Sequence, residues 1–271
     1  MVVREISCRS ILNRSGIPGI DYGINPYVGC GHKCQYCYAV FMKRFTGHTE
    51  PWGDFVDVKT NAPEVLEHQV RRLKSRSTIS FGTVCDPYQP IEEKYELTRH
   101  CLEKLVPYKH EVSILTKSNL VLRDLDVLQR LKDCEVGFTI TSLNRRIREI
   151  FEPGSPPAAQ RFTALKKLAN KGIQTWVFVA PILPALTDSE IDIDNLFGHA
   201  EKAGAEYIMF DTLNPYPKVR RNVRRIVQKQ FPERLEFLDY YFNNQKKYAR
   251  HLKQLIHRIS RSYKIQHRVV F

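Results

Sequence analysis

Three cysteines fall close together near the start of the chain, within the stretch NPYVGCGHKCQYCY. They are Cys30, Cys34 and Cys37, separated by three and then by two residues. A structural zinc ion usually takes four ligands as two closely spaced pairs, so a fourth ligand would have to come from elsewhere, for example from His32 or His48. A cubane [4Fe–4S] cluster normally takes four thiolates. Three thiolates on such a cluster leave one iron open, as a reactive metal centre requires.

Two charged residues directly follow apolar runs further along the chain. Asp86 follows residues 77–84 in the motif CDPYQP, and Lys117 follows residues 110–116 in the motif TKS. A carboxylate accepts hydrogen bonds from an amine, and an ammonium group pairs with a carboxylate. The two side chains are therefore candidates for binding a zwitterionic ligand. The alternatives are an Asp-Pro turn and an exposed loop lysine.

Short β-branched runs alternate with amphipathic segments and predict the elements that position these residues. Expected strands cover residues 20–28, 77–84, 110–116, 134–141, 173–180 and 205–211. Expected helices cover residues 62–74, 93–106, 121–132, 157–171 and 188–203. Six β-then-α units imply a parallel sheet with right-handed crossovers, which is enough for a partial (β/α)6 barrel. In parallel barrels, functional residues gather at the carboxyl ends of the strands.

The last quarter of the chain carries nearly all of the net charge. Residues 216–271 contain 15 Lys or Arg against three acidic residues, whereas the whole chain has a net charge of +13. Residues 219–229 and 232–261 are expected to be helical, with a short strand at the end. The sequence thus predicts a barrel over residues 1–215 and a basic, mainly helical extension over 216–271 that packs on the barrel.

Composition narrows the class of protein. The chain has 271 residues, 42% hydrophobic and 26% charged, which is typical of a globular protein with a full core. The N-terminus has no apolar core segment of a secretory signal, and no apolar stretch is long enough to span a bilayer. Seven unevenly spaced cysteines argue against a disulfide framework. We expect a cytoplasmic protein with no membrane contact.

Together with the six β/α units, the spacing C-x3-C-x2-C resembles the signature of the radical S-adenosylmethionine (SAM) superfamily. Further motifs, VKTNAPEVL, GTVCDPYQPIE, LTKSNLVLRDLDVL and PILPALTD, resemble the subfamily of spore photoproduct lyases, which repair a thymine dimer in DNA. The resemblance covers about residues 20–215. It implies that Cys30, Cys34 and Cys37 ligate a [4Fe–4S] cluster whose open iron chelates SAM. It also implies reductive cleavage of SAM to a 5′-deoxyadenosyl radical that abstracts hydrogen from a substrate.

The same resemblance implies roles for residues around the cofactor. Tyr36, just before the third cysteine, matches the aromatic that packs near the adenine of SAM. Asp86 matches the position that binds the SAM amino group, and Lys117 matches a lysine that pairs with the SAM carboxylate. The remaining candidates are Thr141 and Ser142 for the ribose and Arg161 for a carboxylate. The alternative for Ser142 is a helix cap, and the alternative for Arg161 is a surface charge.

Cys85 departs from the pattern of the photoproduct lyases. These enzymes have a hydrogen-donating cysteine three residues before the equivalent of Asp86, where this chain has Thr83. Cys85 is therefore a candidate hydrogen donor, or else a small buried residue. Either role leaves the substrate and the reaction, lyase or transferase, undetermined.

The partners stay open at this stage. The basic segment 216–271 is suited to nucleic acid, because Lys and Arg neutralise phosphates, or to a reductant such as flavodoxin or ferredoxin. Residues 48–55, HTEPWGDF, are either a substrate lid or a packed connection. The substrate is open among nucleic acid, peptide and small molecule. The alternative to an enzyme is a non-catalytic zinc or iron–sulfur protein that binds nucleic acid.

Overall fold

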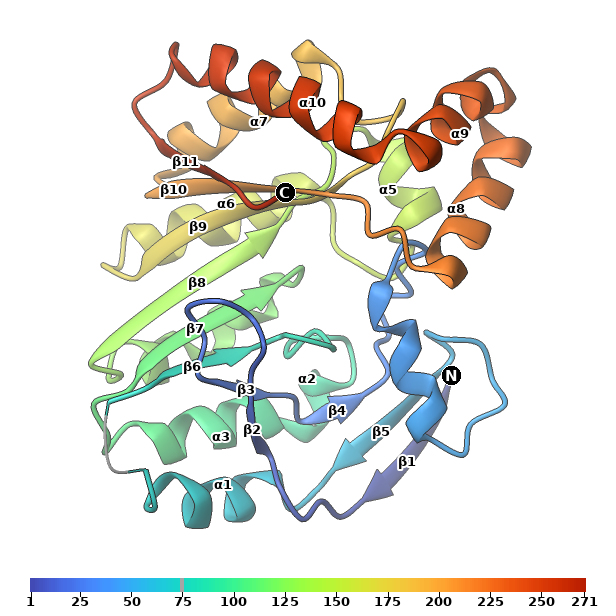
Figure 1. Cartoon of the computed structure of the whole chain (residues 1–271). Helices are drawn as coiled ribbons and strands as arrows, with labels where there is room; N and C mark the ends of the chain where they lie inside the picture. Colours follow the sequence, from blue (N-terminus) through green and yellow to red (C-terminus); the bar gives the residue numbers. More distant parts are fainter. Residues whose placement is uncertain (74–75) are drawn as a thin grey trace.

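A computed structural model describes residues 1–73 and 76–271, and its centre is a curved sheet of eight strands (Figure 1). The strands are ordered β11-β10-β9-β8-β7-β6-β3-β2. The six parallel barrel strands are β3 (Tyr22–Ile24), β6 (Thr78–Phe81), β7 (Glu111–Thr116), β8 (Asp133–Thr139), β9 (Gln174–Ile182) and β10 (Tyr207–Thr212). Strand β2 (Leu12–Arg14) is antiparallel at one edge, and β11 (Gln266–Val269) is parallel at the other. The predicted partial (β/α)6 barrel is confirmed.

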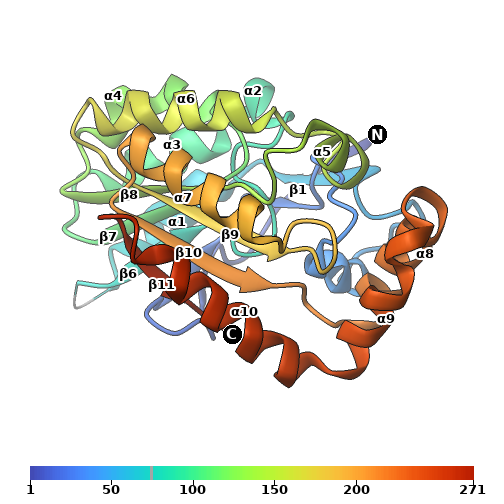
Figure 2. The same cartoon turned by 90° about the horizontal axis from the view of Figure 1, so that it is seen from above.

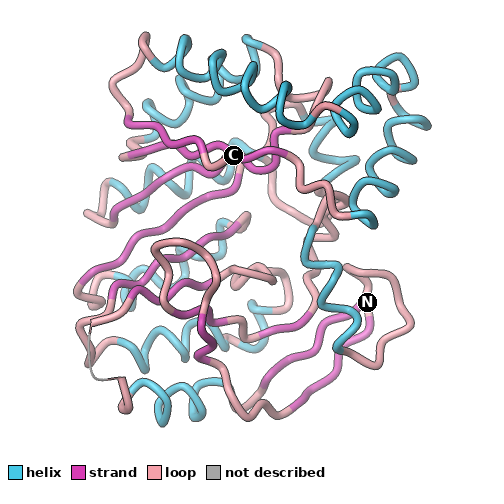
Figure 3. Tube along the Cα trace, in the orientation of Figure 1, coloured by secondary structure: helices cyan, strands magenta, loops and turns pink. Residues whose placement is uncertain are grey.

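Helices follow the successive strands, as right-handed β/α crossovers require. They are α1 (Ala62–Val70), α2 (Glu92–Tyr95), α3 (Leu97–Leu105), α4 (Leu125–Leu128), α5 (Arg145–Phe151), α6 (Ala158–Ala169) and α7 (Glu190–Ala203). In Figure 2, α4 and α6 lie along one side of the sheet, and Figure 3 shows the helices arranged around the strands. The carboxyl ends of the strands therefore stay free for the loops that carry the site.

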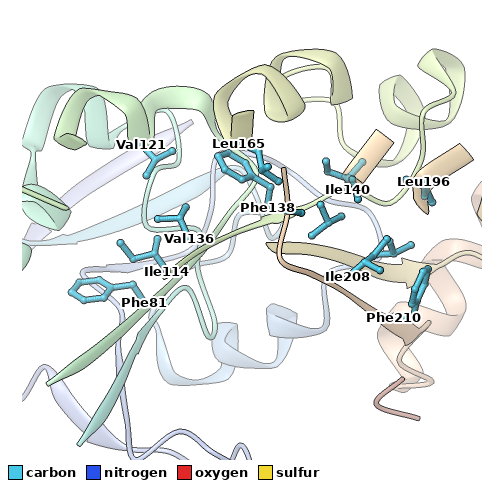
Figure 4. Packing of buried hydrophobic residues seen from close by; sticks show 14 of the residues in the cluster. Phe81, Ile114, Val121, Val136, Phe138, Ile140, Leu165, Leu196, Ile208 and Phe210 are labelled. Atoms are coloured by element: carbon cyan, nitrogen blue, oxygen red, sulfur yellow. The ribbon is translucent and has the colours of Figure 1, made fainter. Parts of the chain in front are cut away.

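The core lies between the sheet and these helices, because alternate strand residues point to opposite faces. Val136 and Phe138 of β8 point toward the helices and pack with Leu165 of α6 (Figure 4). Between them, Gly137 points to the inner face, where an added Cβ would lie 2.3 Å from the ring of Trp176. The inner face is thus filled at this level of β8 and β9 by a large side chain opposite a glycine.

A second sheet was missed by the sequence analysis. It has three strands, β1 (Val2–Ile6), β5 (Phe55–Lys59) and β4 (Tyr27–Val28), in the order β1-β5-β4. The single strand predicted over 20–28 is wrong, because it is split between β3 in the main sheet and β4 in the small one. Asn25 and Pro26 separate the two, and proline cannot donate a ladder hydrogen bond.

Helix boundaries differ from the predictions where the backbone departs from the helical conformation. The helix predicted over 93–106 is broken at Glu96, which has a left-handed φ of 50°. The segment predicted as a helix over 121–132 starts as a 3-10 helix, η2 (Asn119–Asp124), and continues as α4. The helix predicted over 62–74 ends at Val70 as α1, and residue 74 lies outside the described residues.

The basic segment forms helices α8 (Pro217–Gln230), α9 (Leu235–Asn243) and α10 (Gln245–Ser260), with a short 3-10 turn, η3 (Pro232–Arg234), before α9. The helix predicted over 232–261 is therefore interrupted at Asn244, whose φ is −131°. Strand β11 then pairs with β10 and joins the segment to the main sheet. Figure 1 shows α8 beside the 3-10 helix η1 (Tyr38–Phe45), and the two are in contact. The boundary at residue 215 stays a prediction.

No helix in the described part of the chain is both long and apolar enough to cross a membrane.

Candidate metal centre and cofactor site

The three cysteines lie on one tightly folded loop between β4 and η1. The amide of Lys33 donates to the Cys30 carbonyl at 3.3 Å, and the amide of Cys37 donates to the Cys34 carbonyl at 3.2 Å. All three thiols are free and half-buried. Gly29 precedes the loop with a φ of +91°, and an added Cβ there would lie 2.3 Å from the Phe55 carbonyl oxygen. The backbone thus carries the three cysteines on one loop, and only glycine fits at the position before the first of them.

Burial raises the pKa of all three thiols, and it raises the pKa of Cys34 to about 12 although Lys117 opposes the rise. Metal ligation by thiolates must therefore release protons from this loop. Within the described residues, no three His, Cys, Asp or Glu side chains converge on a single ion position. The donor set itself, three thiols of one loop beside a lysine, fits an iron–sulfur cluster with one open iron.

Two residues from distant parts of the chain hold the first turn of the cysteine loop. The side chain of Gln89 accepts from the amide of Gly31 at 2.8 Å and donates to the carbonyl of Gly29 at 3.2 Å. Gly154 and His32 exchange hydrogen bonds, since Nδ1 of His32 lies 3.0 Å from the Gly154 carbonyl and the Gly154 amide donates to the His32 carbonyl at 3.0 Å. Gln89 of the CDPYQP motif therefore holds the first turn of the cysteine loop in place.

Asp86 lies in the loop after β6, its side chain is 8% exposed, and its carboxylate accepts three hydrogen bonds from within the chain. It accepts from the hydroxyl of Thr116 at 2.6 Å, from the amide of Lys117 at 2.7 Å and from the amide of Tyr88 at 2.9 Å. Nε2 of His32 lies 3.2 Å away. Burial alone would raise the pKa of Asp86, but His32 and these donors outweigh it and lower the pKa to about 2.

The expectation that Asp86 binds the SAM amine directly stays a prediction. The carboxylate already accepts three hydrogen bonds from within the chain, which leaves it fewer lone-pair directions for a ligand. The sequence showed a strand end but not the donors that converge there from β7 and from the cysteine loop. In the structure, Asp86 joins β6 and β7 to His32.

Lys117, in contrast, keeps its side-chain charge available. It forms no ion pair with an acidic side chain in the described part of the chain, and its Nζ lies 5.9 Å from the centroid of the Tyr36 ring. Burial alone would lower the pKa of Lys117, but negative charge at Cys34, Glu152 and Asp86 outweighs it and raises the pKa. The ammonium group is therefore retained beside the cysteine loop, where an anionic ligand would meet it.

Tyr36, Glu152 and Arg161 form a buried chain of polar contacts. The Tyr36 hydroxyl donates to Glu152 and lies 3.1 Å from Oγ1 of Thr141. Burial alone would raise the pKa of Glu152, but Arg161 and Lys117 outweigh it and lower the pKa to about 2. Glu152 was missed by the sequence analysis, because a lone Glu before a Pro-Gly turn carries no signal of its distant partners.

Arg161 does not face a ligand. It is 1% exposed, and its guanidinium donates to Glu152, to Ser155 and to the carbonyls of Thr139 and Pro156. The expectation that it binds a cofactor carboxylate stays a prediction, although four hydrogen bonds within the chain already use most of its five N–H groups. Arg161 instead orients Glu152 and, through it, Tyr36.

Thr141 and Ser142 follow β8 and are both buried. The Thr141 hydroxyl donates to the Ala180 carbonyl at 3.1 Å, and the Ser142 hydroxyl accepts from the Asn144 amide at 3.0 Å. Asn144, rather than Ser142, caps helix α5. The two hydroxyls lie at the end of β8, close to the polar contacts of Tyr36, Glu152 and Arg161. Their own hydrogen bonds are with other groups of the chain.

Cys85 lies in a small buried cluster. It is 5% exposed and packs with Tyr27 and Leu97 in a small apolar cluster, with Sγ 3.6 Å from Oδ1 of Asn25. Burial raises the pKa of its thiol to about 12. The expected hydrogen donor is therefore packed in the core, as is common for free cysteine.

Tyr38 directly follows the third cysteine and, unlike Tyr36 before it, is exposed. It is 42% exposed, and its hydroxyl donates to the carbonyl of Thr83. Burial of the hydroxyl raises its pKa to about 12. The sequence signal for this residue is the second tyrosine of the motif QYCY. Its contact with Thr83, which follows β6, depends on the fold and could not be predicted from the sequence.

The fold and the cysteine loop define a radical SAM protein. The model of the radical SAM superfamily matches residues 24–197, and the chain belongs to this superfamily. Its members use a [4Fe–4S] cluster and SAM.

Two proteins of similar sequence and one solved structure of similar fold are described here. An uncharacterized protein of Methanocaldococcus jannaschii is 34% identical over 257 residues, which cover 95% of this chain and 93% of that protein. The radical SAM Nα-GlyT isomerase of Pseudomonas phage M6 is 23% identical over 223 residues, or 81% of this chain and 45% of the isomerase. A spore photoproduct lyase double mutant with bound AdoMet and dinucleoside spore photoproduct has a TM-score of 0.74 at 18% identity, over 98% of this chain and 81% of that one.

Proposed function

We propose that this radical SAM enzyme holds its cluster on Cys30, Cys34 and Cys37. When bound, the cluster and SAM supply an electron and a 5′-deoxyadenosyl group that takes a hydrogen atom from the substrate. The observation that carries the proposal is the single loop with three free thiols beside the ammonium of Lys117, which has no ion-pair partner among the residues that the structure describes. The chain supplies three thiolate ligands and leaves the fourth coordination direction to a ligand.

The residues around the loop divide into contacts and supports. Lys117 is the residue proposed to pair with the carboxylate of SAM, because its ammonium has no acidic partner among the residues described. The ring of Tyr36 is proposed to pack against the adenine. Asp86, Arg161, Thr141 and Ser142 support these positions through internal hydrogen bonds rather than through direct contact. Their removal is therefore expected to disturb the loop and the cofactor together.

The substrate proposed is a nucleic acid. The photoproduct lyase is bound to a dinucleoside spore photoproduct. In this chain, Asn222 of α8 donates to the carbonyl of Gln35, between the second and third cysteines, at 2.7 Å. Lys218, Arg221 and Arg225 share a helix face with Asn222, at the three- and four-residue spacings of one face. A stripe of cations thus borders the cysteine loop, where phosphates would be neutralised.

The test is anaerobic reconstitution followed by incubation with dithionite and SAM. We expect a brown protein with about four irons per chain and release of 5′-deoxyadenosine. Deuterium-labelled oligonucleotides should transfer deuterium into that product. A colourless protein with one zinc ion would overturn the proposal and favour a non-catalytic metal-binding protein. A flavodoxin or ferredoxin is proposed to replace dithionite as the physiological reductant.

A further inference from the structure

The inner face of the sheet becomes more exposed toward the carboxyl ends of β9 and β10. Directly paired residues of neighbouring strands point to the same face. Gly137 of β8, which points inward, pairs with Trp176 of β9, and Trp176 pairs with Tyr207 of β10. The rings of Trp176 and Tyr207 are stacked with centroids 5.3 Å apart, and each residue is only 6% exposed. The inner face is therefore closed at this level.

The next inward level is apolar and only partly covered. Phe178 of β9 pairs with Met209 of β10, and both side chains are half-buried. The next residue of β10, Phe210, points to the opposite face, is fully buried and packs against Phe197 of α7, with ring centroids 5.1 Å apart. Because side chains alternate along a strand, Met209 and Asp211 both point inward.

Asp211 lies beside an irregularity at the end of the strand pair. Phe210 pairs with Val179 of β9. Two residues on, Thr212 pairs with Ile182, so β9 has one extra residue at this level. Such bulges are common next to active sites, where they re-aim a side chain. Asp211 thus lies where functional residues gather in parallel barrels.

The extra residue of β9 connects this strand end to the cysteine loop. The carbonyl of Ala180 accepts from the hydroxyl of Thr141 at 3.1 Å. The same hydroxyl lies 3.1 Å from the hydroxyl of Tyr36, which directly precedes Cys37. Asp211 is therefore on the strand next to the polar contacts that hold the proposed adenine-binding ring.

The carboxylate of Asp211 has few partners within the chain. Its Oδ1 accepts from the amide of Thr212 at 2.7 Å, and in the described part of the chain its Oδ2 has no donor and no cation. Asp188, the carboxylate that follows β9, instead accepts from the amide of Ala185 at 3.0 Å and from the hydroxyl of Tyr248 at 2.9 Å. Burial raises the pKa of Asp211 to about 6. The fold therefore retains a half-buried carboxylate that it does little to stabilise.

Resting on the proposed function, we infer that Asp211 is a specificity-determining residue whose carboxylate accepts a hydrogen bond from the ring N–H of an unpaired nucleobase, while Phe178 and Met209 contact the face of the base. A flat ring with an N–H at its edge matches an apolar surface that ends in an available acceptor. The ring N–H of a base in a duplex is already donated to the complementary base, so the substrate is single-stranded or has the base flipped out. Phosphates are repelled by the carboxylate and are left to the cations of α8.

The experiment measures the binding of two short single-stranded probes to the reconstituted full-length protein. One probe is oligothymidylate. The other is the same oligonucleotide methylated at N3 of each base, which removes the ring N–H and leaves the phosphate charge unchanged. We expect the parent to bind the unmethylated probe roughly tenfold more tightly, as for one hydrogen bond to a charged group. Asp211→Leu should bind both probes equally, with its iron content unchanged.

Two further variants make the comparison specific. Asp211→Asn keeps a neutral acceptor and should retain a preference of only roughly threefold, as for an uncharged hydrogen bond. Asp188→Asn is the matched control, since it changes a buried carboxylate that already has donors within the chain, and it should keep the full preference of the parent.

Three outcomes would overturn the inference. They are equal binding of both probes by the parent, a preference that persists in Asp211→Leu, and a preference that Asp188→Asn also loses. Failure of the proposed function looks different, because the parent would then bind neither probe at low salt or would hold no cluster after reconstitution.

Discussion

Nε2 of His32 lies 3.2 Å from Oδ2 of Asp86, and this contact ties the cysteine loop to the ends of β6 and β7. His32 sits between the first two cysteines, and Asp86 also binds the hydroxyl of Thr116 and the amide of Lys117. A carboxylate that first suggests ligand binding is thereby a structural joint. Loss of the Asp86 carboxylate should therefore reduce iron binding by the cysteine loop as well as SAM binding.

Each cysteine of the loop should be needed for the cluster. Replacing Cys30, Cys34 or Cys37 with Ala leaves two thiolates, too few to hold three irons of a cubane. We expect loss of the broad iron–sulfur absorbance and of SAM cleavage together, with the fold retained by circular dichroism. Cys134→Ala is the control and should keep both. A loop variant with four irons and full turnover would contradict the assignment.

Asp86→Asn should lower the iron content as well as SAM binding. The uncharged amide has one acceptor oxygen in place of two and cannot accept from all three donors of Asp86, so its charged contact with His32 is lost and the loop is less well held. The measurement is iron per chain after reconstitution, beside Asp126→Asn, which removes an exposed ion pair to Arg99. If Asp86→Asn binds iron normally and loses only SAM affinity, Asp86 contacts SAM directly and the structural role is wrong.

Lys117→Met should separate cofactor binding from cluster assembly. The backbone amide that serves Asp86 is kept, while the ammonium is lost. We expect SAM affinity of the loaded protein to fall roughly tenfold to a hundredfold, as for one charged hydrogen bond, with iron content unchanged. Lys94→Met, which changes an exposed lysine over Tyr95, is the control. Unchanged affinity in Lys117→Met would remove this residue from the SAM site.

Asp211, at the end of β10, should make stability depend on pH. Burial raises its pKa to about 6 from an ordinary value of 3.8, so the folded chain binds the proton more tightly than the unfolded chain. The ionised form therefore destabilises the fold above about pH 6, and the effect vanishes below the unfolded pKa. Asp211→Asn should raise the free energy of unfolding by about 3 kcal/mol at pH 7.5 and leave it unchanged near pH 3. Denaturant titrations at both pH values provide the measurement, and equal effects at both would refute it.

Charge reversal should locate the nucleic-acid contact on α8. Lys218 and Arg221 are exposed and form no ion pair in the described part of the chain, whereas Arg224 is bound to Asp239 at 2.8 Å. Changing Lys218, Arg221 and Arg225 to Glu should weaken oligonucleotide binding and reduce its salt slope by about one for each phosphate contact. The probes are short single-stranded DNA, duplex DNA and RNA at several salt concentrations.

The matched control reverses three charges on α10, at Lys246, Arg250 and Lys253, which gives the same change in net charge. Equal weakening by both triple variants would mean general attraction by the basic segment. No binding at low salt would favour a peptide or a small molecule as the substrate.

The sequence by itself determined the three-thiol loop, the alternation of strands and helices and the placement of Asp86 and Lys117 after strands, because spacing and periodicity are local properties. It could not show that 20–28 divides between two sheets, since β4 gains its partner only from β5, thirty residues later. Only the tertiary structure decided which polar groups are already satisfied. Asp86 and Arg161 form several hydrogen bonds with other parts of the chain, while Lys117 has no ion-pair partner among the described residues. Hydrogen-bond saturation depends on residues far apart in the chain, and it separates the residues that hold the site from those free to bind.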